Sequence, residues 1–299
     1  MREATLIETL EPRIILSASL EALDDVIVQS TVNPTGQVTA LFRNVAGRPT
    51  LLQASDAATE WSASDLLAEV GLTSARADTT IFTDPRTGRT SIALISGETL
   101  YLAEQQVDGS WVATDLTAAA SAAESPLRSL TSFVSIGNPN LSTRADDRIH
   151  IAGVSLAGDM LLFRQQVDAE GFVVDGWETT NLTTGDIASR GGTAPQLVGP
   201  ITSYVTSWNG LNIVGLDAGG SIQSFWWAPN LGDRWASADL TRLYGAPQYT
   251  GKVDVFLTAW NAINIVGVTT DGDVVATWWL PSFQGTWRKT GGTCPAELD

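Results

Sequence analysis

Short segments rich in Val, Ile, Thr, Phe and Trp alternate with Gly, Asn, Asp and Pro along most of the chain. This pattern predicts β-strands joined by tight turns. Asn209-Gly210 is typical of a hairpin turn because both residues tolerate a positive φ. Apolar residues at the helical spacing i, i+3, i+4 and i+7 are rare, and the Ala-rich stretch 117–124 is the best candidate for one short helix.

The segments belong to a repeat that is clearest in residues 200–287. Residues 201–215 and 254–267 are near duplicates, in which Trp208 and Trp260 correspond and lie 52 positions apart. Each copy continues with a second glycine, a Trp pair, a Pro and a lone Trp. A period of this length indicates a repeat architecture.

A second motif, Trp-x-x-x-Asp/Asn-Leu, recurs at the end of four units, and a fifth unit keeps only the Trp. Its tryptophans are Trp61, Trp111, Trp177, Trp235 and Trp287. Each unit supplies four strands, and the third strand is apolar on both faces, as in residues 222–227. A sheet of that kind must be covered on both sides, and radial stacking of five such sheets is a β-propeller. A β-sandwich pair is the alternative, but it would not need so regular a repeat.

The predicted fold is therefore all-β, a five-bladed β-propeller of four-stranded antiparallel blades. The blades would cover about 24–72, 73–126, 127–192, 193–246 and 247–299. The fifth outer strand is short, so either the ring ends there or residues 14–20 complete it. The Trp-x-x-x-Asp-Leu motif resembles the blade-closing signatures of several propeller families, which implies that its Trp packs between blades and its Asp ties a turn.

Residues 1–23 do not match the repeat, and Glu3, Glu8 and Glu11 do not suit an ordinary signal peptide. They contain Leu10-Glu-Pro-Arg-Ile-Ile-Leu-Ser-Ala18. This resembles the short Leu-Glu-Pro-Arg-x-Leu-Leu-Ser-Ala motif at the N-termini of many large exported surface proteins of planctomycete bacteria. The resemblance implies an export address and an extracellular or cell-surface location. Alternatively, residues 14–20 form a strand that pairs with the body of the protein.

The formal net charge of −16 surrounds the protein with a negative field that repels phosphate backbones and anionic lipid surfaces. We therefore expect no nucleic-acid partner, and we interpret the acidity as a source of solubility. No apolar run approaches the roughly 20 residues of a membrane span, so membrane insertion is not expected. The single cysteine, Cys294, excludes an internal disulfide and a Cys-rich zinc site.

Residues suited to catalysis are few. His150 is the only histidine, and it aligns with Asn212 and Asn264, which indicates a substituted strand residue rather than a member of a catalytic triad or a metal site. A glycoside hydrolase on this fold would need carboxylates at the channel mouth. The candidates near first strands are Asp78, Asp84 and Asp254, and their spacing does not single them out.

Three acidic pairs could hold Ca²⁺: Asp24-Asp25, Asp146-Asp147 and Asp271-Gly-Asp273. None lies in a loop of alternating oxygen ligands, so we predict no metal site and no cofactor.

The strongest candidate site is a set of Trp and Asn residues in the last two blades. In an up-and-down blade, the turn between strands one and two shares a rim with the turn between strands three and four. Tryptophan faces beside amide and hydroxyl groups suit a sugar, because its C–H face stacks on the ring while its hydroxyls need donors and acceptors. The predicted ligand-binding residues are Trp208, Asn209, Trp226, Trp227, Asn230, Trp260, Asn261, Trp278 and Trp279.

The repeat length, the Trp content and the Trp-Trp-x-Pro…Trp layout resemble the tachylectin-like and fucolectin-like propellers, a group of repeat lectins. This resemblance implies carbohydrate binding without carrying over any individual sugar-binding residue. The first three blades lack the Trp pair and have Gln53-Ala54, Ala103-Glu104 and Arg164-Gln165 in its place. The pairs could equally be core residues between blades 4 and 5.

Three hypotheses follow. The leading one is a non-enzymatic, exported binding module that recognises a carbohydrate or another surface component through the Trp-rich rim of blades 4 and 5. The second is a structural module for protein–protein contact or self-association. The third is a glycoside hydrolase with channel-mouth carboxylates.

Overall fold

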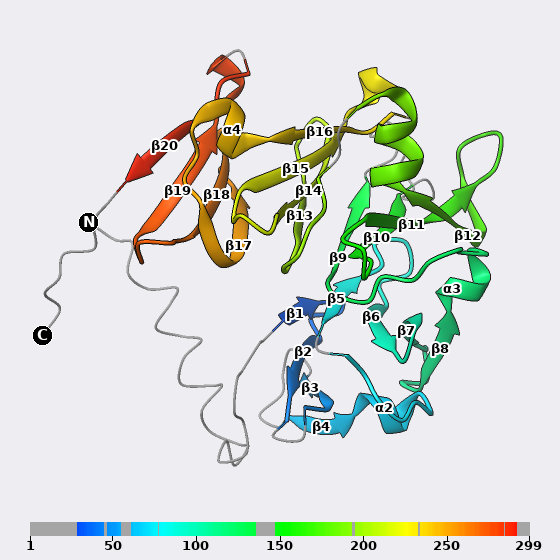
Figure 1. Cartoon of the computed structure of the whole chain (residues 1–299). Helices are drawn as coiled ribbons and strands as arrows, with labels where there is room; N and C mark the ends of the chain where they lie inside the picture. The colour runs from blue at the N-terminus through cyan, green and yellow to red at the C-terminus, as the bar shows by residue number, and fades with distance from the viewer. Residues whose placement is uncertain are drawn as a thin grey trace, which may run out of the picture.

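A computed structural model describes residues 29–291, apart from 45–46, 55–60, 77, 136–146, 193–194, 233 and 284 (Figure 1). The predicted N-terminal address in residues 1–23, the alternative strand at 14–20, and Asp24, Asp25 and Asp146 lie outside the described residues.

The described chain forms five four-stranded antiparallel sheets in which the strands follow chain order, so the predicted all-β five-bladed propeller is confirmed. Blade 1 consists of β1 (Gln29–Val32), β2 (Val38–Arg43), β3 (Pro49–Ala54) and β4 (Ser62–Asp65). Blade 2 consists of β5 (Thr79–Thr83), β6 (Thr90–Ser96), β7 (Thr99–Gln105) and β8 (Trp111–Asp115). Blade 3 consists of β9 (Leu130–Ser135), β10 (Arg148–Val154), β11 (Met160–Val167) and β12 (Val173–Asn181).

Blades 4 and 5 carry the near-duplicate segments. Blade 4 consists of β13 (Thr202–Val205), β14 (Leu211–Leu216), β15 (Ile222–Trp227) and β16 (Ala236–Asp239). Blade 5 consists of β17 (Tyr249–Leu257), β18 (Ile263–Thr269), β19 (Val274–Trp279) and β20 (Arg288–Gly291). Short 3₁₀ turns, η4 (Pro229–Leu231) and η5 (Pro281–Phe283), follow the two Trp pairs.

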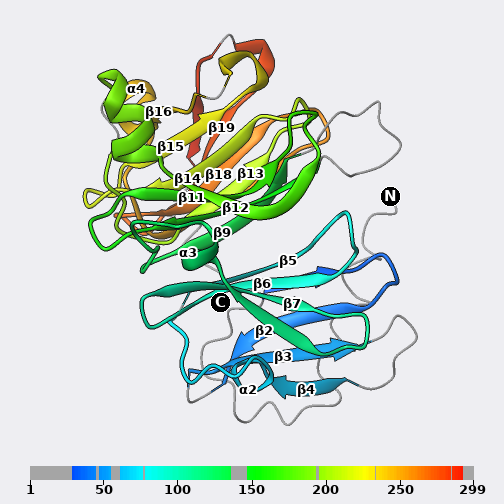
Figure 2. The ribbon, with the colours of Figure 1, turned by 90° about the vertical axis from the view of Figure 1, so that its right-hand side faces the viewer.

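The blades pack side by side through their first strands, β1 on β5, β5 on β9, β9 on β13 and β13 on β17. Figure 2 shows neighbouring sheets packed face to face. Hydroxyl pairs join three of these contacts, Thr31 to Thr83 at 2.7 Å, Thr80 to Ser132 at 2.8 Å and Thr131 to Ser203 at 2.7 Å. The first strands are therefore tied to one another by short polar side chains.

Apolar clusters fill the spaces between consecutive blades, which is why the sheets are apolar on both faces. Fully buried pairs represent the four clusters: Leu51 with Ile92, Leu100 with Phe163, Leu162 with Phe225, and Val214 with Ile265. Each such side chain contributes about 1.5–3 kcal/mol through removal of its surface from water. No blade can obtain this contribution alone, because half of each cluster belongs to its neighbour.

The Trp-x-x-x-Asp/Asn-Leu motif forms the end of a blade and a short helix after it. Trp111 and Trp235 are buried within clusters between blades, and Trp177 packs against another, as predicted. Trp287 of the fifth unit also packs against a cluster between blades. Trp61 is half-buried. The motif Leu begins a short helix and is buried: α2 (Leu66–Glu69), α3 (Leu116–Ala119), the π-helix η2 (Leu182–Ile187), which continues into η3 (Ala188–Arg190), and α4 (Leu240–Tyr244).

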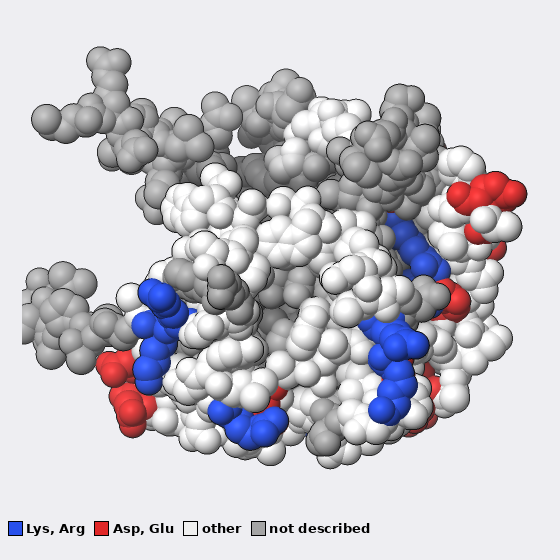
Figure 3. Space-filling view, turned by 90° about the horizontal axis from the view of Figure 1, so that it is seen from above, with Lys and Arg blue, Asp and Glu red and all other residues white. Residues whose placement is uncertain are grey.

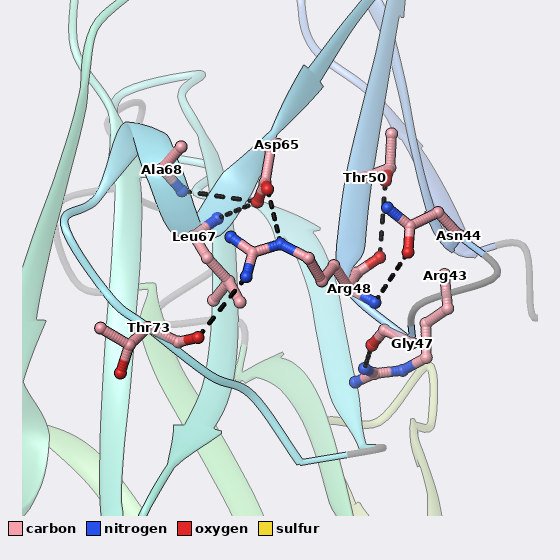
Figure 4. A network of polar contacts seen from close by, with 9 residues as sticks. All are labelled: Arg43, Asn44, Gly47, Arg48, Thr50, Asp65, Leu67, Ala68 and Thr73. Carbon is pink, nitrogen blue, oxygen red and sulfur yellow. Dashed lines mark hydrogen bonds and ion pairs between the residues drawn. The ribbon is translucent and has the colours of Figure 1, made fainter.

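The acidic or amide residue of the motif caps that helix, which confirms that it ties a turn. In blade 1, Asp65 Oδ1 accepts hydrogen bonds from the backbone N–H groups of Leu67 (3.0 Å) and Ala68 (3.4 Å), as Figure 4 shows. Arg48 Nε lies 2.7 Å from the other oxygen of Asp65. The hydrogen bond from Arg48 is the main cause that lowers the pKa of Asp65. This carboxylate, at the end of the fourth strand, joins the residue that precedes the third strand to the helix.

None of the helices in the described part of the chain has the length and hydropathy of a membrane span. The helix expected in residues 117–124 is α3, which begins one residue earlier and ends at Ala119.

Candidate functional site

Two hairpin turns of the same conformation carry Trp208 and Trp260. In blade 4, Thr206 Oγ1 accepts a hydrogen bond from Gly210 N at 2.8 Å, and in blade 5, Thr258 Oγ1 accepts one from Ala262 N at 2.9 Å. These bonds hold residues 206–210 and 258–262 in fixed turns that present the two indoles.

The asparagines of these turns play a local structural part. Asn209 and Asn261 adopt φ values of 59° and 63°, the left-handed region that Asn tolerates better than most residues. Ser207 Oγ donates a hydrogen bond to Asn261 Oδ1 at 2.8 Å. This bond joins the first turns of blades 4 and 5 on one rim.

A cavity of about 290 Å³ lies between blades 4 and 5. Trp208 from a first turn lines it together with Ala228 and Gly285 from third turns, so the turns share one rim as expected. Its aromatic lining consists of Tyr204, Trp208, Trp226, Trp227, Tyr244, Trp279 and Trp287. None of its lining residues is Asp, Glu, Lys or Arg. The cavity is therefore an uncharged, aromatic site.

Aromatic contact between the blades shapes this cavity. The rings of Trp208 and Trp279 lie 5.9 Å apart, centroid to centroid, with their planes inclined by 58°. Tilted ring pairs at this separation are stabilising. Trp208 is 41% exposed, so its remaining surface is open to solvent or to a ligand.

The two members of a Trp pair point in opposite directions. Trp226 lies opposite Asn212 across β14 and β15, and Trp227 lies opposite Leu211. Trp227 packs against the apolar cluster between blades 3 and 4, and Trp279 packs against the cluster between blades 4 and 5. All four paired tryptophans are half-buried. They thus include core contacts as well as cavity surface.

Neutral hydrogen-bonding groups complete the lining. Burial raises the pKa of Tyr204, so its hydroxyl stays protonated at physiological pH. The buried hydroxyl of Ser224 and the amide of Asn212 lie in the same wall, and Asn212 Nδ2 donates to Gly210 O at 2.9 Å. These groups can pair with uncharged polar atoms of a ligand.

The structure brings together only part of the predicted set. Trp208, Trp226, Trp227 and Trp279 line the cavity. Trp260 and Asn230 are exposed and are not among its lining residues, and Asn209 and Asn261 shape the turns. Trp278 lies opposite Asn264, on the face of blade 5 that turns away from blade 4. The cavity therefore holds part of the predicted set, and ligand binding by any of these residues stays a prediction.

Sequence reasoning missed Tyr204, Asn212, Ser224, Tyr244 and Trp287 as lining residues. The available signal was the two-residue period of a strand. Tyr204, Thr206 and Trp208 alternate along one face of the first hairpin, and Asn212 continues that face on the next strand through its pairing with Tyr204.

Blade 3 carries a histidine and two charged residues at the positions that Asn212, Trp226 and Ala236 occupy in blade 4. These positions are His150, Arg164 and Glu178, which lie opposite one another across three strands. Arg164 Nε lies 2.7 Å from Glu178 Oε1, and Arg148 Nη2 lies 2.5 Å from the same oxygen. Blade 3 therefore has no uncharged aromatic wall. The sequence predicted this, because Arg164-Gln165 stands there in place of the Trp pair.

The candidate carboxylates of a hydrolase do not share one mouth of the channel. Asp78 precedes β5 and Asp84 follows it, which separates them by about 20 Å along an extended strand. Asp84 is buried and pairs with Arg86 at 3.1 Å, whereas Asp254 is exposed and pairs with Lys252 at 2.8 Å. The described residues include no group of three His, Cys, Asp or Glu side chains arranged to bind a metal ion.

Comparison with known proteins relates the fold to solved lectin structures. No family model and no curated protein matches the sequence. The BP39L lectin from Burkholderia pseudomallei aligns over 90% of this chain and 70% of its own, with a TM-score of 0.63 and 12% identity.

Two further solved structures align over most of the chain. An arginine-to-alanine triple mutant of AofleA from Arthrobotrys oligospora covers 92% of this chain and 73% of its own, with a TM-score of 0.55 and 13% identity. The SapL1 lectin in complex with α-methyl fucoside covers 91% and 82%, with a TM-score of 0.52 and 11% identity. At these identities the likeness establishes the propeller fold.

Proposed function

We propose that the chain is a non-enzymatic, carbohydrate-binding propeller module whose ligand enters the cavity between blades 4 and 5. The observation that carries the proposal is the composition of that cavity: aromatic faces, neutral hydroxyl and amide groups, and no charged lining residue. A sugar needs this combination, because its C–H face stacks on a ring while its hydroxyls pair with donors and acceptors.

The fold and the remaining polar residues support the same function. Structures of similar fold include lectins, one of them in complex with α-methyl fucoside. His150 is a buried strand residue, and the hydrolase candidates Asp78 and Asp84 lie at opposite ends of one strand. Binding without catalysis therefore accounts for the described site with fewer assumptions than glycoside hydrolysis does.

Direct binding measurements test the proposal. Isothermal titration calorimetry and tryptophan fluorescence would be recorded with α-methyl fucoside and the methyl glycosides of mannose, galactose and glucose. We expect at least one to bind, and Trp208→Ala to weaken its binding roughly tenfold. Val112→Ala, which removes an exposed apolar side chain from blade 2, should leave the affinity unchanged. Absence of binding by every glycoside at millimolar concentration would refute the proposal.

We further propose that the protein is exported and acts at the bacterial cell surface, on the basis of the segment Leu10-Glu-Pro-Arg-Ile-Ile-Leu-Ser-Ala18. Fractionation of the producing cells tests this part, and recovery of the protein only from the cytoplasm would contradict it.

A further inference from the structure

Trp260 is the most exposed tryptophan of the chain, with 69% of its surface accessible. Its turn is held by the hydrogen bonds from Asn261 N to Thr258 O at 2.9 Å and from Thr258 N to Ala262 O at 3.0 Å. This large apolar ring, held on a fixed turn, thus remains exposed to water in the folded protein. Such surfaces mark interaction sites when other apolar residues and polar groups surround them.

The place of Trp260 connects it to the cavity. Ser207, the neighbour of Trp208, donates its hydrogen bond to Asn261, the neighbour of Trp260. The turn that lines the cavity and the turn that carries Trp260 therefore touch. Phe256, which is 52% exposed, lies on the strand that leads into the second turn, and its pairing with Asn264 places it on the face of blade 5 that turns away from blade 4.

The cavity is too small for a long ligand. Its volume of about 290 Å³ lies at the lower end of the range for small-molecule sites. It can take one sugar ring, and further units of a glycan would have to lie outside on the adjoining rim. The exposed aromatic side chain on the adjoining turn is Trp260.

Charge narrows the class of ligand. The cavity has no charged lining residue, and the chain has a net charge of −16. Figure 3 shows a broad uncharged area between separated groups of charged side chains on the face seen from above. Anionic sugars would find no cation in the cavity and would meet a repulsive field around the molecule.

We propose that the site takes a neutral glycan of two or more sugar units, with one terminal unit in the cavity and the next stacked on Trp260. This inference rests on the proposed function, since it assigns a ligand length and a second contact to the same site.

The test compares short and long ligands on wild-type protein and on Trp260→Ala. Paired probes are α-methyl fucoside with 2′-fucosyllactose, and methyl β-glucoside with cellotetraose, measured by calorimetry. In at least one pair the longer probe should bind more tightly, and Trp260→Ala should weaken its binding roughly two- to tenfold. The same variant should leave the affinity for the monosaccharide glycoside unchanged.

Two controls separate the possible failures. Leu156→Ala removes an exposed apolar side chain from blade 3 and should alter neither affinity. If Trp260→Ala changes neither probe, or both equally, this inference fails while the proposed function stands. If no probe binds to the wild type, this inference fails, and the proposed function fails with it only if none of the four methyl glycosides binds either. Loss of a dimer in light scattering on Trp260→Ala would assign the indole to a protein interface and overturn the inference.

Discussion

His150 is held without charge inside blade 3. Its ring stacks on Phe133 with the centroids 4.9 Å apart, and Nε2 lies 2.9 Å from Ser135 Oγ. Burial, followed by the positive charges of Arg148 and Arg164, holds the pKa of His150 well below its usual value of 6.5. At neutral pH the imidazole is therefore a neutral polar side chain within the sheet.

The stability of the protein should respond to this histidine below neutral pH. The unfolded chain binds a proton at the ordinary pKa of about 6.5, and the folded chain does not, so the free energy of unfolding falls as the pH is lowered. For one titrating group, the free energy of unfolding changes by at most about 1.4 kcal/mol per pH unit. Urea unfolding at pH 7.5 and 5.5 measures the loss.

His150→Asn is the matched variant, because Asn212 and Asn264 occupy the equivalent positions of blades 4 and 5. Carboxyl groups titrate in the wild type and in the variant alike. The difference between the two proteins in their loss of stability is therefore due to the histidine. An equal loss of stability in the two proteins would show that His150 does not carry this pH dependence.

Tryptophan shows how far single residues could be interpreted from the sequence. The motif Trp recurs in every unit, which identified it as a packing residue. Two of its copies, Trp111 and Trp235, are buried. Trp226 and Trp227 are adjacent, so alternation along a strand sends them to opposite faces, but it does not say which neighbour each face meets. That assignment needs the order of blades around the ring, which no local pattern contains.

At the scale of elements, the first four blades end in a strand, a cap and a short helix. Asp115 Oδ1 accepts a hydrogen bond from Ala118 N at 2.8 Å, and Asn181 and Asp239 make the corresponding bonds to Thr184 and Arg242. These side chains satisfy backbone donors that a helix leaves unpaired in its first turn. The buried Leu that follows each cap anchors the helix against the blade interface.

Removal of one cap should therefore cost a measurable amount of stability. We expect Asp115→Ala to lower the free energy of unfolding by about 1 kcal/mol. Asp115→Asn should lower it much less, because an amide oxygen can accept the same bond, as Asn181 does in blade 3. Urea denaturation of the three proteins decides between these outcomes. Equal destabilisation by Ala and Asn would mean that the negative charge, rather than the hydrogen bond, stabilises the helix.

The short helices themselves were mostly missed, although the strands were predicted. Helices α2 and α4 have four and five residues, too few to show a helical period of apolar positions. Their sequence signal was the cap followed by Leu, which we had interpreted only as a turn. Helix α3 was found because alanine dominates its surroundings, a matter of composition rather than periodicity.

For the whole molecule, the number of blades followed from the repeat, because each sheet is apolar on two faces and needs two neighbours. The cavity between blades 4 and 5 did not follow. Its walls come from Tyr204 and Asn212 on one sheet and from Ile263 and Trp279 on the next, and only the relative placement of two sheets brings them together. Val268 and Val274 are exposed on the face of blade 5 that turns away from blade 4. The repeat alone therefore does not predict what packs against that face.

The net charge of −16 leads to a last expectation about the ligand, because it acts on every molecule that approaches the rim. Binding of a neutral sugar in a cavity without charged residues should change little between about 20 and 300 mM NaCl, since there is no ionic contact to screen. A sulfated or carboxylated analogue of the same sugar should bind more weakly, and added salt should reduce that difference by screening the repulsion. Calorimetry at the two salt concentrations with a neutral and an anionic form of one glycan measures both effects. Tighter binding of the anionic form at low salt would require a cationic contact. It would contradict binding in the aromatic cavity and would favour a site at Arg148 and Arg164 of blade 3.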